Sequence, residues 1–275
     1  MNYILYYSGE IPKYFKYSIE SILNVENNEC KIFFCGDKTL NQPNVINLNE
    51  NDFSSDLINE IKLLNYFESE KNPLWQSSLL RIFYILECAK ANNINSFVHF
   101  DADVLIYQPF NKIKHYFKDS KLNITPVNEL FLNFSYSYIN NLDVLEKICN
   151  KIFEILKNYK YYENTYYQGN RLNEMIMLNI VYILNPHLFN LLEILPKKEG
   201  NFIFDPGSYG QYLGGIHNKY FSKKYINEEH YVGRNILRNN YKIKFENHRP
   251  YVYSSDIKYS LINLHVHSKK LHKFI

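Results

Sequence analysis

Short apolar runs alternate with longer amphipathic segments along the first hundred residues. The apolar runs predict strands at Tyr3–Tyr7, Cys30–Gly36 and Ser96–Phe100. Helices are predicted between them at Ile11–Leu23, with Pro12 in its first turn, and at Leu74–Asn93. This alternation predicts an α/β fold with a mostly parallel central sheet and helices on both faces. In such open sheets, ligands bind outside the carboxyl ends of the strands.

The second half of the chain has a less regular pattern. Amphipathic or apolar helices are predicted at Leu145–Tyr162 and Asn173–Leu184, and Asn201–Gly215 starts as a strand and breaks into a Gly-rich turn. Tyr241–Asn247 alternates as an edge or half-exposed strand does, and Tyr259–Lys270 reads as a closing strand. No linker, repeat or charge block divides the 275 residues, so we expect a single domain over 1–275.

Composition narrows the class of protein only slightly. Hydrophobic residues make up 46% and charged residues 21%, which is ordinary for a soluble globular protein. A net charge of +3 suits an anionic small ligand or an anionic membrane surface, but it is too weak and scattered to indicate nucleic-acid binding. The only tryptophan, Trp75, starts the strongest predicted helix and is expected in the core.

The cysteines and the N-terminus bear on the compartment. Cys30, Cys35, Cys88 and Cys149 show neither a CxxC pair nor metal-type spacing, so we expect buried reduced thiols and a cytoplasmic location. The N-terminal residues lack the charged and apolar regions of a signal peptide. No stretch approaches the ~20 apolar residues that span a bilayer, so at most peripheral membrane contact is expected.

Two aspartates, Asp101 and Asp103, directly follow the third predicted strand. In an extended segment, residues two apart project to one face, so both carboxylates are expected to point toward one place, with the small Ala102 between them. Such like charges raise each other's pKa unless a cation lies between them, and Mg²⁺ and Mn²⁺ prefer carboxylate oxygens. The alternative is that one aspartate caps a turn and the other is solvated.

Two histidines in the closing strand offer a third ligand. His265 and His267 are also two apart, and Lys269 follows them, where an ammonium group can contact a phosphate. The spacing does not choose between the two histidines, although His265 is slightly preferred.

Arg81 is a charged residue in the helix segment Ser77–Cys88, which is apolar nearly all round. A buried arginine needs a partner, so one interpretation is a structural ion pair with Glu87 or another acid. The other interpretation is contact with a diphosphate, because the planar guanidinium matches phosphate oxygens.

Taken in order along the chain, these pieces resemble glycosyltransferases of the GT-A fold that use nucleotide-sugar donors, especially bacterial and large-DNA-virus enzymes of surface-glycan synthesis. The resemblance covers roughly residues 1–275. Besides the first strand, it rests on Ser78–Leu86, Phe97–Tyr107, Asn173–Asn179, Phe204–Gly215 and Leu264–Leu271. It implies a nucleotide-binding half over 1–110 and an acceptor half over 111–275 with a C-terminal metal and phosphate strand.

The resemblance also implies the donor site. Mn²⁺ or Mg²⁺ would be bound by Asp101 and Asp103 together with His265 or His267. Lys269 and Arg81 would contact the donor diphosphate, near Asp101 and Ala102. The loop Tyr7–Gly9, including Ser8, would hold the nucleoside, with Tyr7 stacked on the base.

For the transfer step, the resemblance places Glu174 near the sugar as a candidate base. The segment departs from the commoner pattern, in which an aspartate directly precedes the apolar run, so Asp205 is a rival candidate. Its neighbours Gly207, Tyr209, Gly210 and Gln211 would line the acceptor side. The implied partners are a nucleotide-sugar donor, with a UDP-sugar favoured, and a glycan or glycolipid acceptor.

Two other functions are compatible with paired aspartates on an α/β sheet. One is a metal-dependent nucleotidyl or phosphoryl transferase, although no P-loop motif is present. The other is a catalytically inactive relative that binds a sugar or nucleotide. The residues do not distinguish retaining from inverting transfer.

Overall fold

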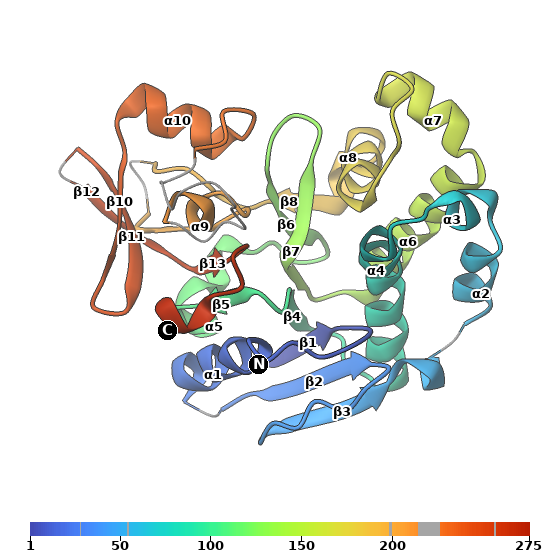
Figure 1. Cartoon of the computed structure of the whole chain (residues 1–275), viewed down its shortest axis with the longest axis horizontal. Helices are drawn as coiled ribbons and strands as arrows, with labels where there is room; N and C mark the ends of the chain where they lie inside the picture. Colours follow the sequence, from blue (N-terminus) through green and yellow to red (C-terminus); the bar gives the residue numbers. More distant parts are fainter. Residues whose placement is uncertain (28, 54, 198–199, 214–225, 256) are drawn as a thin grey trace.

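The computed structural model describes residues 1–27, 29–53, 55–197, 200–213, 226–255 and 257–275. Its centre is a seven-stranded sheet with strand order β3-β2-β1-β4-β7-β6-β8 (Figure 1). The strands are β1 (Asn2–Tyr6), β2 (Lys31–Gly36), β3 (Val45–Asn49), β4 (Phe97–Phe100), β6 (Leu122–Pro126), β7 (Leu132–Ile139) and β8 (Phe189–Leu191). β7 runs antiparallel to both of its neighbours, and the other pairings in this sheet are parallel.

Helices cover both faces of this sheet, as the alternation of strands and helices predicts. α1 (Phe15–Glu26) packs on one face, and α4 (Pro73–Ala91), α6 (Leu142–Lys157) and α8 (Glu174–Leu184) pack on the other (Figure 1). The strand alternation explains this, since Leu5 of β1 joins the core under α1 while Ile4 joins the core under α4. Each fully buried aliphatic side chain of this kind contributes about 1.5–3 kcal/mol.

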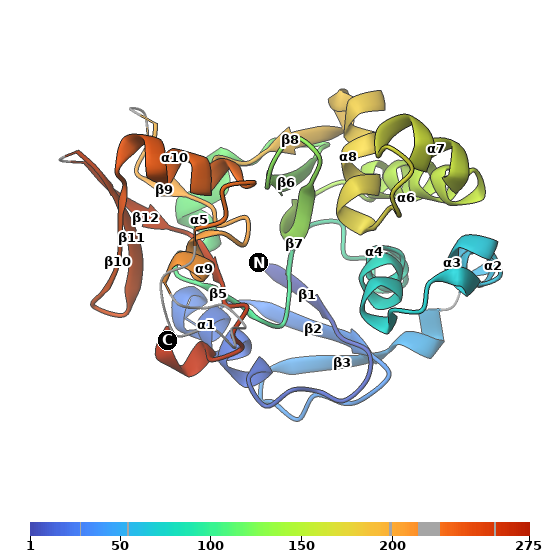
Figure 2. The same cartoon turned by 45° about the horizontal axis from the view of Figure 1, so that its top comes forward.

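Smaller elements complete the C-terminal half. The sheet β10-β11-β12-β9 consists of β10 (Lys242–Glu246), β11 (Arg249–Ser254), β12 (Ile257–Leu261) and β9 (Phe202–Ile203). The remaining helices are α2 (Asp56–Lys62), α3 (Asn65–Ser69), α5 (Phe110–Ile113), α7 (Tyr159–Tyr166), α9 (Tyr209–Tyr212) and α10 (Tyr231–Asn239), with short 3-10 turns at Glu50–Phe53, Lys114–Tyr116, Pro186–Leu188 and Leu271–Lys273. The hairpin of β10 and β11 and the helix α7 lie at opposite ends of the molecule (Figure 1, Figure 2).

One pairing brings the end of the chain to the end of β4. β13 (Asn263–His265) pairs antiparallel with β5 (Val104–Ile106), in a register that sets His265 opposite Val104. His265 therefore lies beside the residue that follows Asp103. Residues more than 160 positions apart in the sequence meet at this point.

Several predicted elements differ from the structure. Helix α1 begins at Phe15 instead of Ile11, because Pro12 and its neighbours form a turn before it. The helix predicted over Leu145–Tyr162 is two helices, α6 and α7, separated at Asn158. The predicted closing strand is also two strands, β12 and β13, in different sheets.

Two burial predictions were wrong in part. Trp75 is 39% exposed, because it lies in the first turn of α4, beyond the part that packs on the sheet. All four cysteines are free, and three are buried, but Cys30 is only half-buried. No helix in the described part of the chain is both long and apolar enough to cross a membrane.

Candidate functional site

The site is built around the turn between β4 and β5. The backbone N–H of Val104 donates to the carbonyl of Asp101 at 3.0 Å, so the chain turns here instead of staying extended. The expectation of an extended backbone at Asp101 and Asp103 was therefore wrong. Asp101 and Asp103 instead take different partners, and Ala102 between them is buried, with its carbonyl accepting from the Ser18 hydroxyl at 2.6 Å.

Asp101 is held by Arg81 of α4. The Arg81 guanidinium pairs with the Asp101 carboxylate through Nη1 and donates from Nη2 to Glu174 Oε1 at 2.7 Å. Arg81 thus lies between two carboxylates, and its side chain is 11% exposed. Glu87, which the sequence suggested as a partner of Arg81, instead lies 3.8 Å from the ammonium of Lys90.

The charges in this cluster shift its titration. Burial raises the pKa of Asp101, but Arg81 and His99 together more than offset this and lower it to about 2. Burial also raises the pKa of Glu174, and here Arg81 compensates only in part. Glu174 is the first residue of α8, whose N-cap Asn173 accepts from the backbone N–H of Ile176 at 3.1 Å.

Asp103 is held by the C-terminal segment. Its Oδ2 accepts from His265 Nε2 at 3.1 Å and from the ammonium of Lys269. The backbone N–H of Val266 also donates to the Asp103 carbonyl at 2.8 Å. Burial raises the pKa of Asp103, but His265 and Lys269 outweigh burial and hold it below its usual range.

The two imidazoles of His265 and His267 stack, with ring centroids 4.1 Å apart. Their candidate ligand atoms and that of Asp103 lie within 4.8 Å of one another, whereas Asp101 is not part of this group in the described chain. His265 donates through Nε2, and its Nδ1 is buried with no hydrogen-bond partner among the described residues. His267 likewise donates through Nε2, to the Gly207 carbonyl at 2.9 Å.

This donor set fits a divalent metal. A carboxylate oxygen and two imidazole nitrogens suit Mn²⁺ better than Mg²⁺, which prefers oxygen ligands. The convergence of a buried carboxylate and two imidazoles, with candidate ligand atoms within 4.8 Å of one another, is the observation that favours a metal here.

Asp205, a predicted rival base, is placed differently. It is fully buried, and its carboxylate accepts five backbone N–H groups, from Gly207, Ser208, Tyr209, Gly210 and His265. A carboxylate saturated in this way has no free oxygen to accept a proton. The geometry favours a structural role, in which Asp205 holds the 205–210 loop against β13.

The glycines of this loop are required by its close approach to β13. A Cβ on Gly210 would lie 1.9 Å from the His265 carbonyl, and Gly207 has φ +97°. Tyr209 is buried, and Gln211 has a buried Oε1 without a hydrogen-bond partner among the described residues. The last two residues of the predicted Gly-rich turn, 214–215, lie outside the described residues.

The loop after β1 lies next to the carboxyl end of β2. Gly9, with φ +96°, donates from its N–H to Asp37 at 2.7 Å, and the Ser8 hydroxyl donates to Glu50 at 3.3 Å. The ring of Tyr7 lies 6.1 Å from that of Phe15, centroid to centroid. The loop is therefore anchored to the residues that follow β2 and β3.

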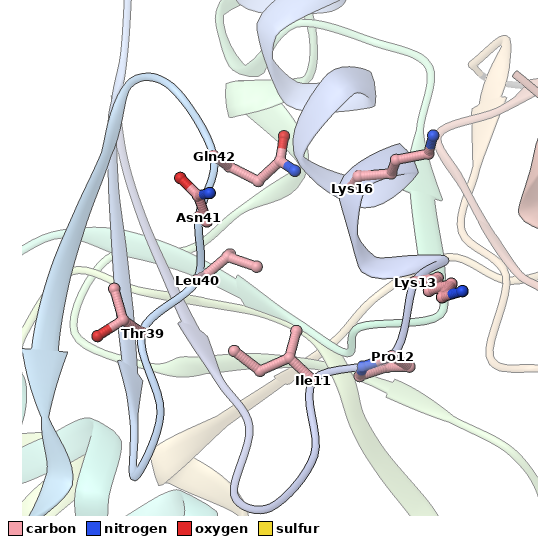
Figure 3. A pocket seen from close by; sticks show the side chains of 8 residues that line it. All are labelled: Ile11, Pro12, Lys13, Lys16, Thr39, Leu40, Asn41 and Gln42. Carbon is pink, nitrogen blue, oxygen red and sulfur yellow. The ribbon is translucent and has the colours of Figure 1, made fainter.

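A cavity of about 360 Å³ opens between the start of α1 and the loop after β2 (Figure 3). Its lining residues are Ile11, Pro12, Lys13, Lys16, Thr39, Leu40, Asn41 and Gln42. Ile11 and Leu40 point toward each other across it, and the amide of Gln42 lies at its edge (Figure 3). The apolar centre and polar edge are typical of small-molecule sites, and the volume is at the lower end of their range.

Two residues near the site were missed by sequence reasoning. The ring of Tyr14, at the N-cap of α1, lies 5.8 Å from the Lys269 ammonium. His99 is fully buried, donates from Nδ1 to the Ile4 carbonyl at 2.8 Å, and has Nε2 3.8 Å from Asp101. Its position two residues before Asp101 was a usable signal, whereas nothing in the sequence singles out Tyr14 among 26 tyrosines.

Comparison with known proteins finds likeness only at the level of structure. No protein-family profile matches the chain, and no curated protein sequence matches it. Mouse xyloside xylosyltransferase 1, in its apo form, is similar at a TM-score of 0.48 and 10% identity, over 70% of this chain and 86% of that chain. The galactosyltransferase LgtC, in complex with donor and acceptor sugar analogs, gives 0.40 and 11%, over 66% and 70%.

A glycosyltransferase involved in glycosylation of the major capsid of PBCV-1 gives a TM-score of 0.36 and 14% identity, over 74% of this chain and 85% of that chain. All three are glycosyltransferases, the class that the sequence resembles.

Proposed function

We propose that this protein is a metal-dependent glycosyltransferase that moves a sugar from a nucleotide-diphosphate sugar, with a UDP-sugar favoured, to a hydroxyl of a glycan or glycolipid in surface-glycan synthesis. The observation that carries the proposal is the cluster of Asp103, which follows β4, with His265, His267 and Lys269 of the C-terminal segment. It combines a divalent-metal donor set with a cation suited to phosphate, at the carboxyl end of a parallel strand.

The donor diphosphate would lie between the metal cluster and the cations of the chain. Asp103, His265 and His267 would hold Mn²⁺, with Asp101 beside them, and the bound ion would supply Lewis-acid stabilisation of the departing diphosphate. Lys269 is the chain's own group for the phosphate charge. Arg81 is committed to Asp101 and Glu174, so its first role is to orient those carboxylates.

The nucleoside would extend from there toward α1. The ring of Tyr14 is 5.8 Å from the Lys269 ammonium, and its sequence neighbour Lys13 lines the cavity. The base would occupy the cavity, beside the anchored loop of Tyr7, Ser8 and Gly9.

Glu174 is the candidate group beside the sugar. In the transfer, the bond from the sugar's anomeric carbon to the diphosphate oxygen breaks, and a bond from that carbon to the acceptor oxygen forms. The acceptor hydroxyl loses its proton, and Glu174 can accept it if transfer is inverting, because burial raises its pKa while Arg81 orients it.

Thermal unfolding with UDP, GDP and CMP, each with and without Mn²⁺, tests this function. A ligand at a hundred times its dissociation constant stabilises by ~2.7 kcal/mol, which is roughly 5–10 °C for a domain of this size. We expect a shift for one nucleotide that requires Mn²⁺, and transfer or hydrolysis of the corresponding nucleotide sugar. No shift with any nucleotide would contradict the proposal, and a shift without turnover would indicate the inactive relative.

A further inference from the structure

Asp103 Oδ2 accepts two hydrogen bonds, one from His265 and one from Lys269, although the same carboxylate belongs to the metal cluster. We propose that Lys269 is an exchangeable counter-ion. Its ammonium neutralises Asp103, gives up that position when a divalent cation binds, and then pairs with the diphosphate. The inference rests on the proposed function. It adds that Lys269 weakens binding of the metal alone but strengthens joint binding of the metal and the nucleotide.

The backbone around Lys269 is fixed, so the ammonium stays within reach after exchange. Val266 N–H donates to the Asp103 carbonyl at 2.8 Å, and Lys269 N–H donates to the Val266 carbonyl at 2.9 Å. Lys269 has φ +61°, a left-handed conformation that is unfavourable for a residue with a Cβ. Such a conformation persists only where the surroundings hold it, and functional sites are enriched in it.

The side chain of Lys269 can move where its backbone cannot. It is 35% exposed and carries its charge at the end of a flexible four-carbon stem. The ring of Tyr14, 5.8 Å from Nζ, offers the ammonium a second favourable position on the side of the proposed nucleotide site. A short swing of the stem is therefore enough to leave Asp103.

Charge explains why the metal and the nucleotide would bind together. A divalent cation and an ammonium that share one carboxylate repel each other, so the metal must displace Lys269 before it can use Oδ2. The displaced ammonium has lost its anion, and a diphosphate supplies a new one. Each ligand then favours the other by the same factor, as linkage requires.

The test uses calorimetry to measure two affinities. The first is the affinity for Mn²⁺ without nucleotide, and the second is the affinity for UDP at saturating Mn²⁺. Lys269→Met removes the ammonium but keeps a side chain of similar length in the same backbone conformation. Lys270→Met is the matched control, because Lys270 is exposed and forms no ion pair within the described chain. It removes an equal charge from the same segment without touching Asp103.

We expect Lys269→Met to bind Mn²⁺ about tenfold more tightly than wild type without nucleotide, and UDP about tenfold more weakly with Mn²⁺. Lys270→Met should stay within about twofold of wild type in both measurements. Equal or weaker Mn²⁺ binding by Lys269→Met would overturn the exchange, as would an equal gain in Lys270→Met. If wild type bound no Mn²⁺ even with UDP, the metal site of the proposed function would fail as well, and the two failures are thereby distinguished.

Discussion

The two aspartates of the site are two residues apart, yet their surroundings differ in kind. Asp101 faces a guanidinium that is 11% exposed and fixed between two carboxylates, whereas Asp103 faces an ammonium that is 35% exposed and a histidine on a neighbouring strand. Asp101 thus belongs to an arrangement in which each charge is already paired inside the fold. Asp103 belongs to the arrangement that we propose exchanges partners, so under this proposal a short DxD motif combines a structural carboxylate with a ligand-binding one.

Replacing Asp103 with Asn breaks the exchangeable half and should have the largest effect. Because it removes the carboxylate of the metal cluster, we expect turnover to fall ~10²–10³-fold, with Mn²⁺ binding lost and the fold retained. Calorimetry with Mn²⁺ and a transfer assay measure the two effects.

Asp101→Asn is its matched control. It weakens the pairing with Arg81, so we expect a loss of about 1–3 kcal/mol in the free energy of unfolding and a smaller loss of Mn²⁺ affinity than in Asp103→Asn. If the two variants lost metal binding equally, the two carboxylates would not differ as proposed.

Replacing Arg81 with Leu breaks the fixed half. It leaves Asp101 and Glu174 as like charges in a buried place, so we expect the free energy of unfolding to fall by about 3–5 kcal/mol. Chemical denaturation measures this loss. The triple variant Arg81→Leu with Asp101→Asn and Glu174→Gln should recover part of it, because no unpaired charge remains. A stable single variant with weaker nucleotide binding would instead favour direct phosphate contact.

Filling the cavity tests nucleotide binding without changing either Asp101 or Asp103. Gln42→Trp places a large ring at the cavity edge, so we expect UDP affinity to fall by about tenfold, or ~1.4 kcal/mol. Mn²⁺ affinity without nucleotide should not change, and Gln42→Ala, which widens the cavity, should have the smaller effect on UDP. Unchanged UDP affinity in Gln42→Trp would place the base elsewhere.

The two halves of the site also differ in how much of them the sequence could predict. The strand before Asp101 and the buried helix of Arg81 follow from local apolar patterns, and the sheet they predict is present. The pairing of β13 with β5 depends on a contact more than 150 residues apart, and no local pattern encodes it. The partners of Arg81 stayed open for the same reason, because Glu174 lies 93 residues further along the chain.

Wrong predictions came from treating local patterns as continuous. Asp101 and Asp103 were expected on one extended face, but a hydrogen-bonded turn separates their partners. Asp205 had the right neighbours for an acceptor site, yet five backbone donors occupy its oxygens, which only the folded loop reveals. The conformation of short loops is set by tertiary contacts, so a motif can mark a site correctly and still assign its members the wrong roles.

The loop that supports His265 can be probed by pH without changing either aspartate, and this effect should be the smallest. Burial lowers the pKa of His230, whose Nδ1 lies 2.8 Å from the Ser208 hydroxyl next to Asp205. As the pH falls through about 6.5, His230 therefore takes up a proton in the unfolded chain but not in the folded chain. The contribution of neutral, buried His230 to stability is present above pH 6.5 and is lost as the pH falls below it.

We expect the free energy of unfolding, measured in a chelator, to fall less steeply below pH 6.5 in His230→Gln than in wild type. The difference should be about 1 kcal/mol or less between pH 7 and pH 5, because His230 is only partly buried and one proton accounts for at most ~1.4 kcal/mol per pH unit. His272→Gln, at an exposed histidine, should leave the wild-type slope unchanged. Identical slopes in His230→Gln and wild type would mean that folding does not lower the pKa of His230. The loop beside His265 would then be more open to water than the contacts of His230 with Ser208 and Asn227 indicate.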